Sequence, residues 1–277
     1  MNPNLTQLVQ ACDTLGISYT IYHSSGNLIE VSHANQTHLF VNWTTPFNSH
    51  AIAKLCTDKE YFYRIVHPIV PMPATIGYVN PSTVKYHSYV SFNSTEAIAN
   101  DILAHFATPV IVKMNRGTTG INVFFCNSFD EIQQRLEQIF NRNSSLFDYV
   151  ALAQQYISIQ REYRVIYLDG VLQFAYEKNI DQATFAGNLS RLHWNGARAV
   201  VVDDAQMLAE IHALCAPLFE RLPLRFCGLD IARDEQGRLW MIEANSSPGF
   251  DVFVRDGGGA RMIELYQRML RSLFDIR

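Results

Sequence analysis

The sequence lacks the two short glycine motifs that most often mark a nucleotide-phosphate site. Neither GxxxxGK[ST] nor GxGxxG occurs in its 277 residues. A P-loop and a Rossmann-type fingerprint both depend on these spacings, so neither kind of phosphate cradle is predicted. Nucleotide chemistry in this chain would need another arrangement of residues.

Cysteine is scarce and shows no pairing pattern. The five cysteines are an odd number, lie far apart and form no C-x-x-C pair. Structural zinc sites and disulfide frameworks use closely spaced or even-numbered cysteines, so the sequence disfavours both. We expect small buried thiols instead.

Excess positive charge and long apolar runs are also absent. The 22 Lys and Arg residues stand against 26 Asp and Glu residues, a formal charge of −4, which gives no general reason to bind nucleic acid. No apolar run reaches about 18 residues, and no basic segment precedes an apolar one at the start. We expect a cytoplasmic protein with neither a membrane nor a nucleic-acid partner.

What is present fits a globular protein of mixed secondary structure. Hydrophobic residues make up 48% of the chain and charged residues 17%, which is ordinary for one or two folded domains. Periodicity and capping residues predict helices at 5–15, 49–56, 58–66, 95–105, 129–141, 205–220 and 263–274, and strands at 17–22, 38–42, 109–114, 121–126, 149–157, 163–168, 171–176, 229–232 and 239–242. Strands grouped with helices favour an α+β fold.

The most informative segment is a predicted β-hairpin, because it brings two carboxylates together. Two apolar runs, 229–232 and 239–242, flank a turn-forming segment. A two-residue turn and a four-residue loop give the same pairing, in which Asp230 faces Glu243. Directly opposed Cβ atoms lie about 5 Å apart, and like charges there destabilise a sheet unless a cation compensates.

A third polar side chain extends this pair. Asn245 lies two residues beyond Glu243, so it points to the same face of the strand. Two carboxylates and an amide oxygen suit Mg²⁺ or Mn²⁺, and Mg²⁺ commonly completes its shell with substrate phosphates. The alternative is a solvated polar face on an edge hairpin, which the apolar flanks disfavour because they indicate a central position.

The segment GLDIARDEQGRLWMIEANSSPG resembles the metal-binding signature of the ATP-grasp superfamily, particularly of the ligases related to glutathione synthetase, cyanophycin synthetase and the ribosomal-protein glutamate ligases. The resemblance runs from about residue 51 to the C-terminus. It implies that Asp230, Glu243 and Asn245 hold Mg²⁺ ions that bridge the phosphates of ATP. It also implies two α+β subdomains that grip the nucleotide, preceded here by a small or truncated α/β domain.

This organisation divides the chain into three predicted parts. Residues 1–70 form the small N-terminal α/β domain, which ends in a stretch rich in proline. Residues 71–152 form the central ATP-grasp subdomain with a glycine-containing phosphate loop. Residues 153–277 form the C-terminal subdomain with an adenine hinge and the metal hairpin.

The same resemblance implies residues that bind the triphosphate. Lys113 ends an apolar strand, and its counterpart in the family contacts phosphate while the following loop closes over it. Lys59 matches a second phosphate contact. The loop residues implied are Gly117, Thr118, Thr119 and Gly120, where glycine lets backbone N–H groups approach oxygens. The alternatives are a plain hairpin end at Lys113 and a solvated helical turn at Lys59.

The run Gln155, Tyr156 and Ile157 resembles the adenine hinge, in which backbone groups read the purine edge. Gln155 departs from the family, which usually has an acid near this position. Glu162 matches the acid that binds ribose, and Arg164 is a candidate for stabilising phosphate or oxyanion charge. A salt-bridged, exposed strand edge is the alternative explanation for Glu162 and Arg164.

Other residues are candidates for catalysis and substrate binding. Asn188 resembles an asparagine that lies near the phosphates in glutamate ligases, and we group it with Lys113 and Arg164 as catalytic. The candidates for binding a substrate carboxylate are Arg191, Ser246, Ser247, Gly249 and Arg255. Ordinary packing of polar loops is the alternative for these positions.

Together these features predict an ATP-dependent ligase that joins a small-molecule or peptide carboxylate to an amine through an acyl phosphate. Two alternatives remain: an ATP-grasp kinase for a small molecule, and an ATP-binding regulatory protein with a degenerate site, which Gln155 motivates. The short N-terminal unit also leaves a homo-oligomer open. We expect Asp230→Asn and Glu243→Gln to stop ADP release without unfolding the chain.

Overall fold

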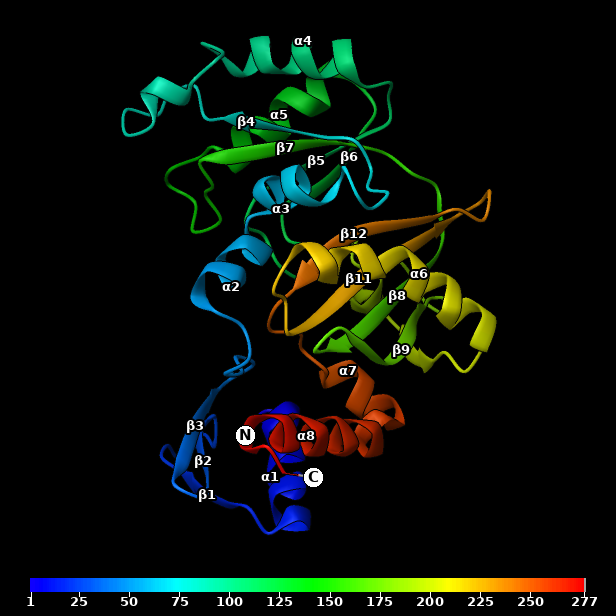
Figure 1. The fold of residues 1–277 in the computed structure, drawn as a ribbon. Coiled ribbons are helices and arrows are strands. Elements are labelled where there is room, and N and C mark those ends of the chain that lie inside the picture. The colour runs from blue at the N-terminus through cyan, green and yellow to red at the C-terminus, as the bar shows by residue number, and fades with distance from the viewer. Residues whose placement is uncertain (277) are drawn as a thin grey trace.

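Three antiparallel sheets, each with its own helices, follow one another through the molecule. The computed structural model describes residues 1–276. Figure 1 shows the sheet near the N-terminus at the bottom, the five-stranded sheet in the middle and the four-stranded sheet at the top. We call them the N-terminal, large and central sheets.

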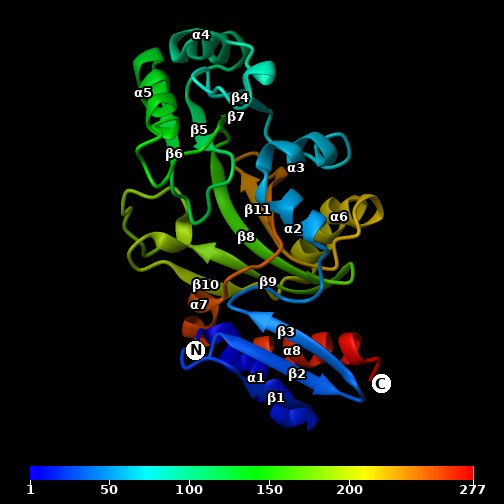
Figure 2. The ribbon, with the colours of Figure 1, turned by 90° about the vertical axis from the view of Figure 1, so that its left-hand side faces the viewer.

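Both ends of the chain build the N-terminal unit. The N-terminal sheet has the order β1-β2-β3, and helix α8 lies against helix α1 beside it in both views (Figures 1 and 2). One hydrophobic core joins these elements. Their bounds are α1 Pro3–Leu15, β1 Ser18–Ile21, β2 Leu28–His33, β3 Gln36–Val41 and α8 Gly259–Phe274.

The central sheet has the order β4-β7-β5-β6 and is covered on one face by helices α4 and α5. Apolar side chains at alternate positions of its strands, such as Val110 and Val112, are buried beneath those helices. The elements are β4 Thr75–Val79, α4 Thr95–His105, β5 Val110–Met114, β6 Val123–Cys126, α5 Phe129–Ile139 and β7 Val150–Gln155.

The large sheet has the order β10-β9-β8-β11-β12. Helix α6 covers one face, and helices α2 and α3 contribute to the same core. The elements are α2 His50–Thr57, α3 Lys59–Val66, β8 Ile159–Leu168, β9 Val171–Asn179, β10 Arg198–Val201, α6 Ala205–Arg221, β11 Phe226–Asp234, β12 Leu239–Asn245 and α7 Asp251–Phe253.

Alternation along β8 separates the core beneath α6 from the opposite face, where Ile166 and Leu168 join the core of the N-terminal unit. Tyr163, Val165 and Tyr167 are buried in the core beneath α6. Glu162 and Arg164 therefore point to the opposite face, because successive side chains of a strand alternate. This period of two places charged residues on one side of the sheet without interrupting the apolar core on the other.

The mixture of helices and antiparallel strands confirms the predicted α+β class. The segment 181–199 was predicted as a polar loop, but its last two residues begin strand β10. The sequence did not predict this strand, because four residues are too few to show a pattern of period two. The proline-rich stretch contains β4, an edge strand of the central sheet. Proline lacks a backbone N–H, and this is tolerated beside an edge strand, where one side of the strand has no partner. The division at residues 70 and 152 stays a prediction.

No helix in the part of the chain that the structure describes combines the length and apolarity needed to cross a membrane.

The side chain of Leu8 is fully buried in the core that α1 and α8 share. Its replacement tests how much this core contributes to stability. We expect Leu8→Ala to lower the free energy of unfolding by about 2–5 kcal/mol, because it removes apolar contacts and leaves a cavity. Urea denaturation measures the change. Gln10→Ala, at an exposed position of the same helix, is the matched control and should change stability by less than about 0.5 kcal/mol.

Candidate active site

Asp230 is the centre of a buried cluster of charges on the large sheet. It lies opposite Arg164 on the neighbouring strand β8. The Arg164 guanidinium donates two hydrogen bonds to its carboxylate, one of them 3.0 Å long from Nη2 to Oδ2. The Lys178 Nζ atom lies 2.9 Å from the same Oδ2. Two cations therefore compensate this carboxylate within the protein itself.

Lys178 also joins Glu162 to the cluster. Its Nζ atom lies 2.5 Å from Glu162 Oε1, and the Lys178 side chain is only 3% exposed. Arg191 Nε approaches the other oxygen of Glu162 at 3.8 Å. The exposed strand edge that was the alternative explanation for Glu162 and Arg164 is therefore wrong, because these side chains lie in an enclosed network of acids and bases.

Burial and pairing act in opposite directions on these groups. Burial tends to raise the pKa of Asp230, but Arg164 and Lys178 lower it to about 2. Burial tends to lower the pKa of Arg164 and of Lys178, but Asp230 raises both. All three groups are therefore charged at neutral pH, and each depends on the others for compensation.

Sequence reasoning did not assign Lys178 to the site, and a β-bulge explains why. Continued without interruption from the pairing of Leu168 with Val171, the β8–β9 hairpin would set Lys178 opposite Arg161. A bulge between Ile166 and Tyr167 shifts the register by one residue. Lys178 then falls beside Glu162 instead. Its signal in the sequence is one of two adjacent charges, Glu177 and Lys178, near the end of a largely apolar strand.

The predicted pairing of Asp230 with Glu243 is confirmed. The predicted turn is wrong: Arg233 pairs with Leu239, and a bulge after Asp230 restores the pairing further along the hairpin. The Asn245 amide donates to Glu243 Oε1 at 3.3 Å, so the two side chains meet as predicted.

Lys59 connects this hairpin to the glycine-containing loop. Its Nζ atom lies 3.6 Å from Glu243 Oε2 and donates a hydrogen bond to the carbonyl of Gly117. The Lys59 side chain is 14% exposed, so it is not the solvated helical lysine that was the alternative. The start of α3 is fixed to the loop as well, because the Glu60 N–H donates to Asn115 Oδ1 at 2.9 Å.

Asn188, from the segment between β9 and β10 of the large sheet, holds the same loop. Its amide donates to the carbonyl of Thr119 at 2.9 Å. Gly120 follows with φ of 73°, and a Cβ atom there would lie 2.1 Å from Asn188 Oδ1. Glycine is therefore required at this contact. Thr118, the remaining predicted loop residue, is exposed.

Lys113 lies buried on the open face of the central sheet. Its Nζ atom donates to Gln154 Oε1 at 2.9 Å, and the Gln154 amide donates to Thr75 Oγ1 at 2.9 Å. Burial and the positive charge of Lys59 lower the pKa of Lys113 to about 8, although Glu243 opposes the shift. The charges of Lys113, Lys59 and Glu243 therefore lie close enough to influence one another.

The predicted adenine hinge begins at Gln155, the last residue of β7. The Gln155 backbone N–H donates to the carbonyl of Ala74 at 2.8 Å, and its side-chain oxygen accepts from the Ala74 N–H at 3.3 Å. The Tyr156 ring packs edge-on against Phe125, with centroids 5.0 Å apart, and Ile157 is half-buried. Gln155 thus extends the pairing of β7 with β4 by one residue.

Both predicted substrate-binding arginines, Arg191 and Arg255, are already engaged with backbone. Arg191 donates to the carbonyls of Ile159 and Gln160, at 2.5 and 3.0 Å. Arg255 donates to the carbonyl of Ala197 at 2.8 Å. Both guanidinium groups fix loops, which leaves them fewer donors for a substrate carboxylate.

The predicted serine turn follows β12 and is fixed by the first helix. The Asn4 amide donates to the Pro248 carbonyl at 3.2 Å, and Asn4 Oδ1 accepts from the Phe250 N–H at 3.2 Å. Ser246 is buried and Ser247 is half-buried, whereas Gly249 is exposed. Asn4, which sequence reasoning missed, joins the N-terminal unit to the end of the metal hairpin.

The donor set of the hairpin fits a hard divalent cation. Within residues 1–276, no three His, Cys, Asp or Glu side chains gather as a metal-binding group. The predicted site therefore depends on the carboxylates of Asp230 and Glu243, the amide oxygen of Asn245 and phosphate oxygens to complete the shell, which is a common arrangement for Mg²⁺.

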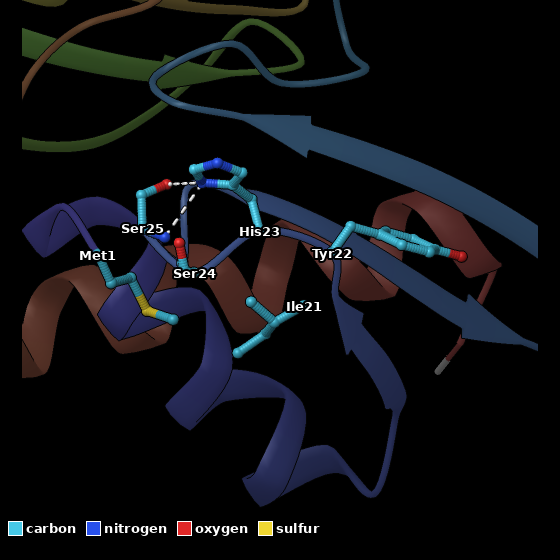
Figure 3. Close-up of a pocket in the computed structure, with 7 residues that line it drawn as sticks. Met1, Ile21, Tyr22, His23, Ser24 and Ser25 are labelled. Atoms are coloured by element: carbon cyan, nitrogen blue, oxygen red, sulfur yellow. Dashed lines mark hydrogen bonds between the residues drawn. The ribbon is translucent and has the colours of Figure 1, made fainter.

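A separate hollow of about 480 Å³ lies at the turn between β1 and β2. Its lining residues run from Ile21 to Gly26 and include Met1. Figure 3 shows His23 and Ser25 joined there by a hydrogen bond of 2.8 Å. It shares no residue with the predicted site, so its presence does not bear on the nucleotide.

The ion cluster changes one expectation from the sequence. Asp230→Asn leaves Arg164 and Lys178 buried with one fewer negative charge, so we expect it to lower the free energy of unfolding by about 3–5 kcal/mol. Glu243→Gln is the matched variant on the partner strand. The Glu243 side chain is 26% exposed and its ion pair is 3.6 Å long, so its loss should cost less than about 1 kcal/mol. Urea denaturation that finds the two variants equally stable would contradict this account.

Comparison with known proteins identifies the family to which most of this chain is similar. The family described as "RimK-like ATP-grasp domain" matches residues 84–273. A probable alpha-L-glutamate ligase of Aeromonas salmonicida is 26% identical over 159 residues, covering 57% of this chain and 49% of that protein. The chain spans about half the length of the curated relatives that it matches.

Two solved structures show the same fold. The D-cycloserine synthetase DcsG aligns with a TM-score of 0.61 and 18% identity, over 95% of this chain and 94% of that one. The ATP-grasp ligase PsnB, complexed with minimal precursor, Mg and ADP, aligns with a TM-score of 0.55 and 16% identity, over 82% of this chain and 62% of that one. These likenesses and the family match confirm the predicted ATP-grasp fold: the chain belongs to the family of RimK-like ATP-grasp domains.

Proposed function

We propose that this protein is an ATP-dependent ligase that joins a carboxylate to an amine through an acyl phosphate and releases ADP and phosphate. One observation carries the proposal. Three cations from different elements lie around the carboxylate of Glu243. Lys59 from α3 forms an ion pair with it. The charge of Glu243 also opposes the lowered pKa of Lys113 in the central sheet and adds to the raised pKa of Arg164 in the large sheet. Such a concentration of cations suits a triphosphate.

The chain's own residues would perform distinct tasks. Lys59 and Lys113 would neutralise phosphate oxygens, and the loop from Gly117 to Gly120 would cover them with backbone N–H groups. Arg164 would stabilise charge that develops on the transferring group. Its pairing with Asp230 holds the guanidinium in position, so little reorganisation would accompany the reaction.

The chemistry needs no covalent protein nucleophile. A substrate carboxylate oxygen would attack the γ-phosphorus of ATP; the bond from that phosphorus to the ADP oxygen breaks, leaving an acyl phosphate. The amine nitrogen then attacks the carbonyl carbon, phosphate leaves with the electron pair of the C–O bond, and the nitrogen loses a proton. Charge stabilisation is the main requirement for the first step.

A bound Mg²⁺, for which Mn²⁺ is the alternative, would supply further neutralisation of the transferring phosphoryl group. Asp230, Glu243 and Asn245 are the proposed ligands. The accessible Glu243 and Asn245 are the residues best placed to respond to metal, since Asp230 is 7% exposed and already paired with two cations.

The relatives guide the proposed substrates. The curated relatives are named probable alpha-L-glutamate ligases, and the PsnB structure contains a precursor. We therefore propose an amino acid or peptide as one substrate, in a cytoplasmic setting. A small-molecule kinase and an ATP-binding protein without turnover are the competing functions, and the products distinguish them: the ligase alone releases both ADP and inorganic phosphate and makes an amide.

Glu243→Gln tests the proposed site without disturbing the ion cluster. We expect ADP release in the presence of Mg²⁺ and a pool of amino acids and short peptides to fall at least a hundredfold, because a proposed metal ligand loses its charge. A coupled ADP assay and mass spectrometry of the products measure the change. Glu220→Gln, at an exposed position of α6, removes the same charge elsewhere and should leave turnover unchanged. Near-normal turnover of Glu243→Gln would reject the metal assignment.

Lys113 gives the proposed nucleotide site a pH signature. With a pKa of about 8, this lysine is half-protonated near pH 8, and a bound triphosphate would raise its pKa. Nucleotide binding should therefore take up as much as about half a proton at pH 8 from this group and almost none near pH 6. Calorimetry in buffers of different ionisation enthalpy measures the uptake. Lys113→Arg keeps the charge but does not titrate, so the uptake at pH 8 should disappear. Equal uptake by the two proteins would assign the proton to another group.

A further inference from the structure

A second cavity, of about 360 Å³, lies where α2 meets α3. Neither the ion cluster nor the metal hairpin contributes to it. Its lining residues are Ala51, Lys54, Leu55, Thr57, Asp58, Tyr61 and Arg116. None of them is among the predicted site residues.

The cavity carries more positive than negative charge. Within residues 1–276, the Lys54 ammonium has no hydrogen bond or ion pair. The Arg116 side chain is 60% exposed, and its Nη2 atom lies 3.6 Å from Asp58 Oδ2. That distance is an ion pair but not a hydrogen bond. Two cations therefore face one acid, in a chain whose formal charge is −4.

Asp58 is committed to the fold and neutralises the cavity only in part. Its Oδ1 atom accepts the Tyr61 N–H at 3.1 Å and caps α3, and the side chain is 11% exposed. The guanidinium of Arg116 and the ammonium of Lys54 thus keep donors that no group within residues 1–276 uses. Unused donors of this kind are suited to an anion that can accept several hydrogen bonds.

The remaining wall is apolar. Leu55 and the ring of Tyr61, which is 60% exposed, border the same space. A large aromatic side chain left open beside two cations suits an organic anion better than an inorganic one, because the ring can cover carbon atoms of the ligand.

The cavity adjoins the proposed nucleotide site along the chain. Arg116 precedes Gly117, and Asp58 precedes Lys59, which donates to the Gly117 carbonyl. The Arg116 N–H donates to Asp148 Oδ2 at 2.8 Å, which fixes this end of the loop. A ligand in the cavity would therefore lie beside the glycine-containing loop, on the side of the α2–α3 junction.

We propose that this cavity is a subsite for the carboxylates of an acidic amino-acid or peptide substrate, held by Lys54 and Arg116 with its carbon chain against Tyr61. The assignment of the ligand as substrate rests on the proposed ligase function. The subsite would bind a part of the substrate distant from the reacting group. It would therefore contribute to the affinity for the substrate and not to the chemical step.

Calorimetry with tetraglutamate, in the absence of nucleotide, tests the subsite independently of turnover. We expect Lys54→Gln and Arg116→Gln each to weaken tetraglutamate binding by about tenfold, because each removes a charged donor. Arg221→Gln, which changes the net charge equally at an exposed position at the end of α6, is the matched control and should bind as the wild type does. Both variants lie at exposed positions, and circular dichroism checks that they fold.

Several results would overturn the proposal. These are a wild-type protein that does not bind tetraglutamate, and a Lys54→Gln variant that binds it as tightly as Arg221→Gln does. Inorganic phosphate is the second probe: if it alone shows binding that depends on Lys54, the site takes a free anion and not a substrate.

An ADP assay on the same proteins separates this proposal from the ligase function. ADP release without Lys54-dependent binding rejects the subsite alone. Lys54-dependent binding of tetraglutamate without ADP release under any substrate pair rejects the ligase, and with it the role of the bound peptide as substrate.

Discussion

The pairing of Asp230 with Arg164 and Lys178 is the interaction on which the rest of the site depends. It joins three neighbouring strands, β9, β8 and β11, through charges that have been removed from water. Each charge is tolerated only because the others compensate it. The part of this face around Asp230 is therefore polar, whereas Ile166 and Phe226, further along the same strands, belong to the apolar core of the N-terminal unit. Arg164 and Lys178 are held in position before any ligand binds.

Across from this cluster, the site brings like charges together. Lys59 and Lys113 come from different elements, yet the first lowers the pKa of the second. Glu243 offsets part of that repulsion through its ion pair with Lys59. An arrangement that is unfavourable in the free protein becomes favourable when a polyanion enters. The repulsion between Lys59 and Lys113 in the free protein is thus also what would favour a bound polyanion.

Sequence patterns predicted the parts of this site that depend on period and order. The pairing of Asp230 with Glu243 and the side shared by Glu243 and Asn245 follow from the two-residue repeat of a strand. Lys178 and the true turn of the metal hairpin were missed because two single-residue bulges alter the registers, and neither bulge has a signal in composition. Asn4 was missed because its partners, Pro248 and Phe250, lie far along the chain.

The packing of α8 against α1 has a consequence for the order of folding. Residues 1–41 supply one helix and three strands of the N-terminal unit, but its core includes Met262, Leu265 and Met269 from the last helix. During synthesis the early segment must therefore wait, with apolar surface uncovered, until the ATP-grasp subdomains have been made. Until α8 has been made, that uncovered surface is the part of the chain most prone to aggregate.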